Sequence, residues 1–470
     1  MSRSILEIPL HANITFKEIS TFFANALSTV TSGISELGKQ AEVQLKKAES
    51  HINDLLSDQA GVATDAFAVD DPVSGKRLVV CIDGTWQSPG TGADAPSQGG
   101  LKVSQTLTPS NITKIAYLLG NGRNQHDLDQ DSLAQKVYYH SGVATEVHDK
   151  KSQQLEGNFG NIHEHLLDAY IWLAKEYREG DEIYAFGFSR GATIVRSLFS
   201  FIRYAGLAKR KQYEDHGTFV KRVYEAFDLY RTRLDSSDRH AAKVLEFQEN
   251  ECHHHVLLKF IGVFDTVESL NVPEGYSKLI PSELITEVKK AIGAIEPNEY
   301  HDLRIGTSVL HAYHALAIDE NRPFFAPMLF EAVDEQQLVP GSTREQKWFR
   351  GAHGDIGGGW WEHGLSDISL SWMIEKAREA GLQIRNLESF DVFISPLLLG
   401  TDRDYYLSRK QLKVHDFYAL NPGSKAYGEK NARDLKHYMD ERLFYKSSLH
   451  ESVVSVLGKE EIPDNLKPFF

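Results

Sequence analysis

The pentapeptide Gly-Phe-Ser-Arg-Gly centred on Ser189 is the stretch whose residue types and spacing point most directly to chemistry. An apolar run at 183–187 is typical of a strand, and the apolar periodicity of 192–204 predicts a helix after the serine. A nucleophile elbow has this strand–turn–helix context, in which a tight turn lifts the serine hydroxyl off the sheet. Side chains at Gly187 and Gly191 would clash within such a turn. We therefore expect Ser189 to be a nucleophile.

A serine hydroxyl needs a base, usually histidine, and a carboxylate that orients and stabilises that base. In an open parallel sheet these groups gather at the carboxyl ends of the strands. Asp265 directly follows the apolar run 256–264, and His353 follows a strand-like segment at 346–349. The chain order Ser, Asp, His is also that of α/β-hydrolases. The sequence therefore predicts a triad of Ser189, Asp265 and His353.

Other residues compete for the roles of acid and base. Glu268 is an alternative acid, although it lies further from the strand end. Among the 20 histidines, His314, His363 and His450 are alternative bases. His353 is preferred because nearby glycines on both sides let the backbone and a ligand approach closely.

Two further patterns suggest different chemistry, and neither is favoured. The triplet at 253–255 consists of histidines, but alternate residues of a strand point to opposite faces, so we interpret it as structural and expect no metal. A strand that ends in Asp-x-Asp-Gly-Thr marks haloacid-dehalogenase-like phosphatases. Here Cys81 occupies the position of the first, nucleophilic aspartate, and this class is therefore rejected.

Acyl transfer also requires two N–H donors for the oxyanion of the tetrahedral intermediate. One donor is expected from the backbone of Arg190, the residue after the nucleophile. Gly84 and Thr85, which follow the apolar strand-like run 78–82, are expected to supply the other. Asp83 is expected to hold that loop through side-chain to backbone bonds or to line the pocket.

Strand-like and helix-like segments alternate from residue 76 onward, and this alternation predicts a mostly parallel central sheet with helices on both faces. The fold class expected is therefore an α/β-hydrolase fold. Residues 76–470 are predicted to form the hydrolase domain, and segments around 207–250 and 275–320 are predicted as helical insertions that form a cap. Residues 1–75 are predicted as a helical segment and linker that packs on the domain or a partner, with a helix lying on a membrane surface as the alternative.

The composition of the chain limits the classes of partner and the cellular compartment that we expect. The 470 residues carry a net charge of −14, which argues against a nucleic-acid partner. Only two cysteines occur, which fits a reducing compartment. The chain shows neither a signal peptide nor an apolar run approaching the roughly 18 residues of a membrane span. We expect synthesis in the cytoplasm and no cofactor.

Five motifs of the chain, taken together, resemble the DUF2235 family, the α/β-hydrolase group that contains Tle1-type type VI secretion phospholipases. The motifs that carry this resemblance are Cys81-Ile-Asp-Gly-Thr-Trp86, Gly187-Phe-Ser-Arg-Gly-Ala192, Gly262-Val-Phe-Asp-Thr-Val267, Ala315-Leu-Ala-Ile-Asp-Glu320 and Trp348-Phe-Arg-Gly-Ala-His-Gly-Asp-Ile-Gly-Gly-Gly359. They span about residues 76–470, in order. The family often has Asn where this chain has Gln87, and Ser where it has Gly354.

The resemblance implies a nucleophile at Ser189, an acid at Asp265 and a base at His353. It implies hydrolysis of glycerophospholipid acyl esters, delivery by a type VI system, and a secretion-apparatus or immunity partner. We therefore expect a phospholipase A-type antibacterial effector that contacts a lipid or ester substrate at a membrane surface. The alternatives are a soluble carboxylesterase and a non-catalytic interaction module on a hydrolase scaffold.

Overall fold

The structure is a computed structural model that describes residues 75–84, 110–119, 135–140, 162–211, 214–234, 236–267, 302–322, 325–360, 363–384, 412, 414–415, 431–441, 444–457 and 462–469. These residues all belong to one compact unit of the chain, 62–276 with 298–470. The predictions for residues 1–74 lie outside the described part. None of the helices that the structure describes is both long and apolar enough to cross a membrane.

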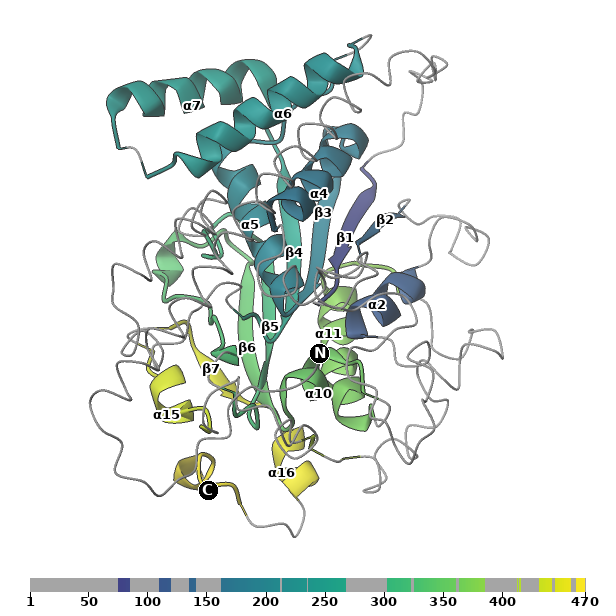
Figure 1. Cartoon of the computed structure of the whole chain (residues 1–470), viewed down its shortest axis with the longest axis vertical. Coiled ribbons are helices and arrows are strands. Elements are labelled where there is room, and N and C mark those ends of the chain that lie inside the picture. The colour runs from purple at the N-terminus through teal and green to yellow at the C-terminus, as the bar shows by residue number, and fades with distance from the viewer. Residues whose placement is uncertain are drawn as a thin grey trace, which may run out of the picture. The chain divides into compact units, whose positions relative to one another are not determined.

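A parallel sheet of seven strands forms the centre of the described residues (Figure 1). The strands are β1 Arg77–Ile82, β2 Gln135–His140, β3 Glu182–Phe188, β4 Leu257–Phe264, β5 His311–Ala317, β6 Thr343–Phe349 and β7 Ser447–Leu449. Their order across the sheet is β2-β1-β3-β4-β5-β6-β7, and every neighbouring pair is parallel. The predicted parallel α/β architecture is therefore confirmed.

Helices cover both faces of this sheet. The described helices are α2 Asn111–Leu119, α4 Ile162–Glu176, α5 Arg190–Ala205, α6 His216–Arg231, α7 Asp238–Glu251, α10 His353–Gly357, α11 Gly364–Glu379, α15 Leu435–Tyr438 and α16 Ser452–Leu457, with short 3₁₀ turns η6 Glu335–Gln337 and η9 Lys467–Phe469. Alternate residues of β1 point to opposite faces: Leu78 and Val80 pack with α4 and α5, whereas Val79 and Cys81 pack with α2 and α11. Strands buried on both faces explain the continuous apolar runs in the sequence.

The strand order contains a switch point between β1 and β3. From β1 the chain moves outward to β2, and it then returns to place β3 on the other side of β1 before continuing to β4. The loops that leave β1 and β3 therefore diverge at the carboxyl edge of the sheet. Ligands of open α/β sheets bind in the crevice at such a point. Ser189 and Gly84 follow these two strands.

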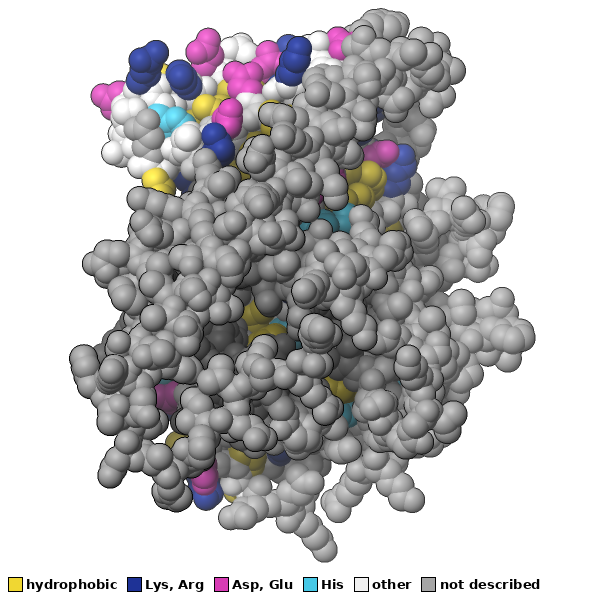
Figure 2. All heavy atoms as spheres, in the orientation of Figure 1, with side chains coloured by type: hydrophobic (Ala, Val, Ile, Leu, Met, Phe, Trp, Pro, Cys, Tyr) yellow, Lys and Arg dark blue, Asp and Glu magenta, His cyan; other side chains and the backbone are white. Residues whose placement is uncertain are grey.

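Helices α6 and α7 confirm that the segment around 207–250 is helical, but they lie at the end of the sheet where the strands begin (Figure 1). The reason is the length of α5, whose 16 residues carry the chain about 24 Å from the carboxyl edge back to the amino edge. A bridge between Ala208 and Cys252 closes this excursion before β4 begins. The two helices therefore do not cap the strand ends that carry Ser189. Their outer face carries side chains of both charges (Figure 2).

The prediction of a helical insertion around 275–320 is wrong for its last part. Residues His311–Ala317 form the strand β5 between β4 and β6. The alternation of alanine, leucine and aromatic residues there suits a helix as well as a strand, and a short apolar run does not distinguish the two. The segment forms a strand that is buried on both faces, since all residues of β5 after His311 are buried. Residues 268–301 lie outside the described part.

The segment near the carboxyl end belongs to this fold. It adds β7 beside β6, and its apolar side chains build a third cluster against the ends of β5 and β6. That cluster contains Leu316, Ile318, Leu329, Trp348, Leu435, Val453 and Leu466. Asp434 caps the short helix α15 by accepting a hydrogen bond from the backbone N–H of His437. Residues 431–438 are therefore held firmly against the sheet edge.

We predict that Leu435→Ala lowers the free energy of unfolding by about 2–5 kcal/mol, the usual cost of truncating a buried leucine. Leu435 is 1% exposed. Leu245→Ala on α7 is the matched control, because Leu245 is 58% exposed and its truncation should cost under about 0.5 kcal/mol. Urea unfolding followed by circular dichroism measures both. Equal losses would contradict a packed carboxyl-end segment.

Candidate active site

Ser189 lies in the sharp turn between β3 and α5. Its backbone angles are φ 56° and ψ −122°, a conformation that L residues rarely adopt. A Cβ at Gly187 would lie 2.6 Å from Ala192 Cα, and one at Gly191 would lie 2.2 Å from the carbonyl oxygen of Ile82. Both contacts are with backbone, so the turn excludes side chains at these positions. The local geometry is that of a nucleophile elbow.

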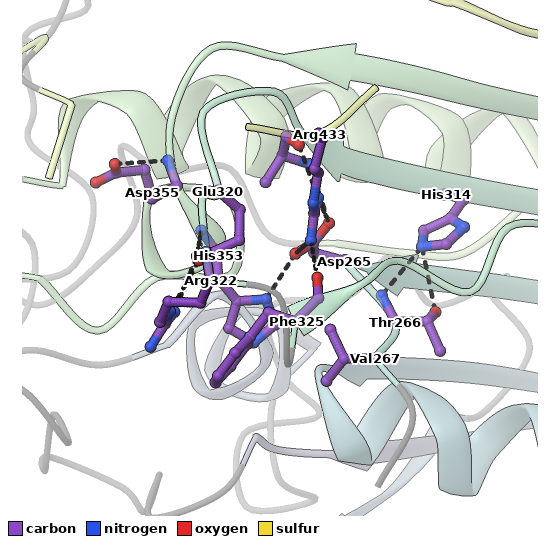
Figure 3. A network of polar contacts seen from close by, with 12 residues as sticks. Asp265, Thr266, Val267, His314, Glu320, Arg322, Phe325, His353, Asp355 and Arg433 are labelled. Carbon is purple, nitrogen blue, oxygen red and sulfur yellow. Dashed lines mark hydrogen bonds and ion pairs between the residues drawn. The ribbon is translucent and has the colours of Figure 1, made fainter. Parts of the chain in front are cut away.

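Asp265 and His353 meet at the carboxyl edge of the sheet (Figure 3). Asp265 follows β4 with φ 37°, and His353 is the first residue of α10. His353 Nδ1 lies 2.6 Å from Asp265 Oδ2, and both side chains are buried. An ionised carboxylate only accepts hydrogen bonds, so Nδ1 carries the proton and Nε2 is the basic nitrogen. The structure thus brings together two of the three predicted triad residues.

Ser189 lies beside this pair. Its backbone N–H donates to the carbonyl of Phe264, the residue before Asp265, at 3.0 Å. The ring of Phe188, the residue before Ser189, lies 4.7 Å from that of His353 between centroids. The backbone of Ser189 therefore contacts the strand end that carries the acid, and its neighbour Phe188 packs near the imidazole. This proximity places Ser189, Asp265 and His353 in one region of the sheet edge.

Four hydrogen bonds surround the Asp265 carboxylate. Oδ1 accepts from Ala317 N at 3.0 Å and from Arg433 Nη1 at 2.6 Å. Oδ2 accepts from His353 Nδ1 at 2.6 Å and from Arg433 Nη2 at 2.9 Å. Sequence reasoning missed Arg433, since nothing in a lone arginine 168 positions from Asp265 marks it as a partner. Its place on the carboxylate is visible only in the folded chain.

The pKa values of Asp265 and His353 are both lowered from their ordinary values. Burial by itself raises the pKa of Asp265, but the charge of Arg433 and the hydrogen bond with His353 outweigh it and lower that pKa. Burial lowers the pKa of His353 from its ordinary value of 6.5, and its contact with Asp265 offsets this only in part. At neutral pH the pair is therefore an ionised carboxylate and a neutral imidazole. A neutral imidazole is the form that accepts a proton.

Aromatic and charged neighbours fix the imidazole in place. The ring of Phe325 packs edge-on against that of His353 with 4.9 Å between centroids. The backbone N–H of His353 donates to Glu320 Oε2 at 3.1 Å. Glu320 is in turn held by Arg322 through Nε at 2.8 Å and Nη2 at 2.9 Å. Two ion pairs, Asp265–Arg433 and Glu320–Arg322, thus orient the histidine through its ring and its backbone.

The loop after β1 lies next to the nucleophile. A Cβ on Gly84 would lie 3.4 Å from Ser189 Cβ, so the loop approaches the serine as predicted. However, the Gly84 N–H donates to Asp83 Oδ1 at 2.8 Å, and this bond directs it to the carboxylate rather than toward an oxyanion. The role of Gly84 as an oxyanion donor therefore stays a prediction. Thr85 lies outside the described residues.

Asp83 has the loop-holding role that the sequence suggested. Its buried carboxylate also accepts from Ser110 Oγ at 2.6 Å, Thr113 Oγ1 at 2.8 Å and Tyr139 OH at 2.9 Å. Burial raises the pKa of Asp83, and its hydrogen bonds oppose that rise. The carboxylate therefore ties the end of β1 to α2 and β2.

Arg190 is the first residue of α5, so its backbone N–H lies in the first turn of the helix, directly after the nucleophile. This is the position that the oxyanion prediction requires. Burial lowers the pKa of the Arg190 side chain to about 9. The positive end of the α5 dipole points to the same region.

The alternative bases are bound elsewhere. The buried His314 accepts from the backbone N–H of Thr266 through Nε2 at 3.1 Å, and burial lowers its pKa to about 3. His363 pairs with Asp367, and His450 contacts Ser452. Glu268 lies outside the described residues. Within the part of the chain that the structure describes, no cluster of His, Cys, Asp and Glu has the arrangement of a metal site, and His253 packs on Tyr177.

Comparison with known families gives a match to "T6SS, Phospholipase effector Tle1-like, catalytic domain" over residues 76–376, which is more than half of the chain. These residues include Ser189, Asp265 and His353, but not Arg433. An uncharacterized protein of Saccharomyces cerevisiae is 27% identical over an alignment of 271 residues, and the match covers 55% of this chain and 33% of that protein. The chain thus spans about a third of the length of this curated relative.

Two solved structures are also similar. An uncharacterized protein from Pseudomonas aeruginosa has a TM-score of 0.39 and 14% identity, covering 84% of this chain and 55% of that one. The Tle1 effector bound to the VgrG spike of the type VI secretion system has a TM-score of 0.33 and 16% identity, covering 64% and 56%. At these values neither similarity bears on the substrate.

We predict that Asp83→Asn lowers the free energy of unfolding by about 1–3 kcal/mol. The asparagine NH₂ group would face hydrogen-bond donors where a carboxylate oxygen now accepts, and buried hydroxyls would lose their acceptor. Tyr139→Phe is the control: it removes one of the four donors and should cost about 1 kcal/mol. Chemical denaturation measures both variants. If Asp83→Asn were no more costly than Tyr139→Phe, the carboxylate would not organise this loop.

Proposed function

Because the chain belongs to the family of Tle1-like catalytic domains of type VI secretion phospholipase effectors, we propose that it hydrolyses acyl esters of glycerophospholipids with Ser189, Asp265 and His353 as a catalytic triad. The observation that carries the proposal is the 2.6 Å contact between His353 and Asp265 at the sheet edge where the Ser189 elbow lies. A neutral imidazole with a buried carboxylate on Nδ1 is the arrangement that activates a serine hydroxyl.

The proposed reaction uses these three residues in the following roles. Ser189 Oγ attacks the ester carbonyl carbon while His353 Nε2 takes the hydroxyl proton, and Asp265 stabilises the imidazolium that forms. The backbone N–H of Arg190 donates to the developing oxyanion, and the second donor comes from the loop after Gly84. When the tetrahedral intermediate collapses, His353 gives its proton to the leaving alcohol. Water then attacks the acyl-enzyme by the same steps and releases the fatty acid and free Ser189.

The family also supports a proposal about delivery. As a member of a type VI effector family, the chain is proposed to be carried by that secretion system and to contact its apparatus. The Tle1 effector whose solved structure is similar is bound to a VgrG spike, which makes a spike protein the first partner to test.

We predict that Ser189→Ala abolishes covalent labelling by a fluorophosphonate probe, because the probe traps only an activated serine hydroxyl. Ser197→Ala is the matched control: Ser197 is a buried serine of α5, two turns along the same helix, and its loss should leave labelling unchanged. Gel fluorescence and peptide mass spectrometry identify the modified residue. Unlabelled wild-type protein would favour a non-catalytic module.

We predict that the wild-type protein releases fatty acid from vesicles of phosphatidylethanolamine and phosphatidylglycerol, and that Ser189→Ala lowers the rate by at least about 1,000-fold. Mass spectrometry of the lipids measures the products, and p-nitrophenyl acetate serves as the soluble ester. Rapid cleavage of the soluble ester with intact vesicles would replace the phospholipase by a soluble carboxylesterase.

A further inference from the structure

The partner of the catalytic acid comes from a part of the chain beyond residues 76–376, which match the family. Arg433 makes two hydrogen bonds to Asp265, one to each carboxylate oxygen, at 2.6 and 2.9 Å. We propose that Arg433 is a positioning residue that balances the charge of Asp265 and so keeps His353 neutral, and the enzyme active, into mildly acidic solution. This inference rests on the proposed function, in which neutral His353 is the base.

The arginine is held in place from several directions. Its Nη1 also donates to Ala317 O at 2.7 Å, and its Nη2 donates to Phe325 O at 2.5 Å. Asn465 Nδ2 donates to the Arg433 carbonyl at 3.4 Å, and the buried Leu435 anchors the following turn. A guanidinium whose geometry is fixed in this way restrains the carboxylate on which it is bidentate. Arg433 therefore orients Asp265 toward His353 Nδ1.

The charge of this arrangement differs from that of a triad with an unpaired carboxylate. A carboxylate beside an imidazole favours the imidazolium, because opposite charges attract strongly in a buried site. A guanidinium on the same carboxylate repels the imidazolium and cancels much of that attraction. The Asp265 side chain is fully buried and that of Arg433 is 5% exposed, so water screens this pair little.

The other charged groups around His353 are themselves paired. Glu320, on the backbone side of the histidine, is bound by Arg322 through two nitrogens. Asp355, on the same short helix, accepts from the backbone N–H of His415 at 2.9 Å and contacts its ring. His314, on the strand beside Asp265, is buried and its pKa is lowered.

Tyr438 lies on α15 near Arg433, and burial raises its pKa, so it stays neutral. The charge of Arg322 also lowers the pKa of His353 and that of Glu320 raises it, so these two groups oppose each other at the imidazole. Arg433 differs from them because it acts on the carboxylate that His353 contacts.

The test compares Arg433→Gln, which removes the charge, with Arg433→Lys, which keeps it without the bidentate geometry. We expect the acid limb of kcat/KM for the wild type below pH 6.5, the ordinary pKa of His353, because activity is lost as pH falls and the imidazole is protonated. Arg433→Gln should move this limb upward by about one pH unit or more. Arg433→Lys should lower kcat and leave the limb near its wild-type position.

Arg344→Gln is the matched control. Arg344 is also a buried arginine, and it donates to the carbonyls of Ile305 and Gly306 at 2.9 and 2.7 Å. Its loss should reduce thermal stability without moving the acid limb. A limb that shifts equally in both variants, or in neither, would overturn the role of Arg433.

Nitrogen-15 NMR titration of His353 provides a readout that does not depend on turnover. A wild-type pKa above 6.5 overturns the inference even if Arg433→Gln does not fold, and a higher pKa in Arg433→Gln than in the wild type supports it. If the wild type hydrolyses no ester but its His353 pKa still responds to Arg433, the proposed function fails while the electrostatic inference holds.

Discussion

The buried carboxylate of Asp265 is the constraint on which the rest of the site depends. A charge without access to water is stable only when its lone pairs are filled, and here each oxygen accepts two hydrogen bonds. The donors come from β5, α10 and the segment before α15, which are far apart in the chain. One group therefore requires the central sheet, the loop after β6 and the carboxyl-end segment to be assembled at once. The geometry of Asp265 and His353 therefore depends on the packing of all three parts.

The sheet supplies the second constraint, which is close approach at its carboxyl edge. Because β1 and β3 are adjacent but feed loops that diverge, the end of β1 faces the start of α5. Gly187 and Gly191 permit contacts that any side chain would block, and Gly84 lies against Ser189. Asp83 then secures the end of β1 through donors from α2 and β2. The strained turn at Ser189 is maintained because the surrounding backbone packs closely around it and holds it in this conformation.

Helices α6 and α7 and the carboxyl-end segment contribute to different parts of the domain. Helices α6 and α7 pack at the end of the sheet opposite to the site, so the described helices of this segment contribute to the core rather than to a cap. The carboxyl-end segment, in contrast, contributes a strand, an apolar cluster and the arginine on the catalytic acid. Part of the electrostatics of the site therefore lies outside the residues that match the family.

The sequence alone determined what depends on neighbours in the chain. The elbow around Ser189, the aspartate that ends β4 and the histidine after β6 are local patterns, because a strand end places the next residue at the sheet edge whatever the remaining fold. The order of the strands, the identity of β5 and the position of α6 and α7 depended on packing between distant segments. The engagement of Asp265 by Arg433 also needed the tertiary structure, since a hydrogen bond between residues 168 positions apart leaves no periodic signal in the chain. The same holds for Asp83, whose partners Ser110, Thr113 and Tyr139 come from distant segments.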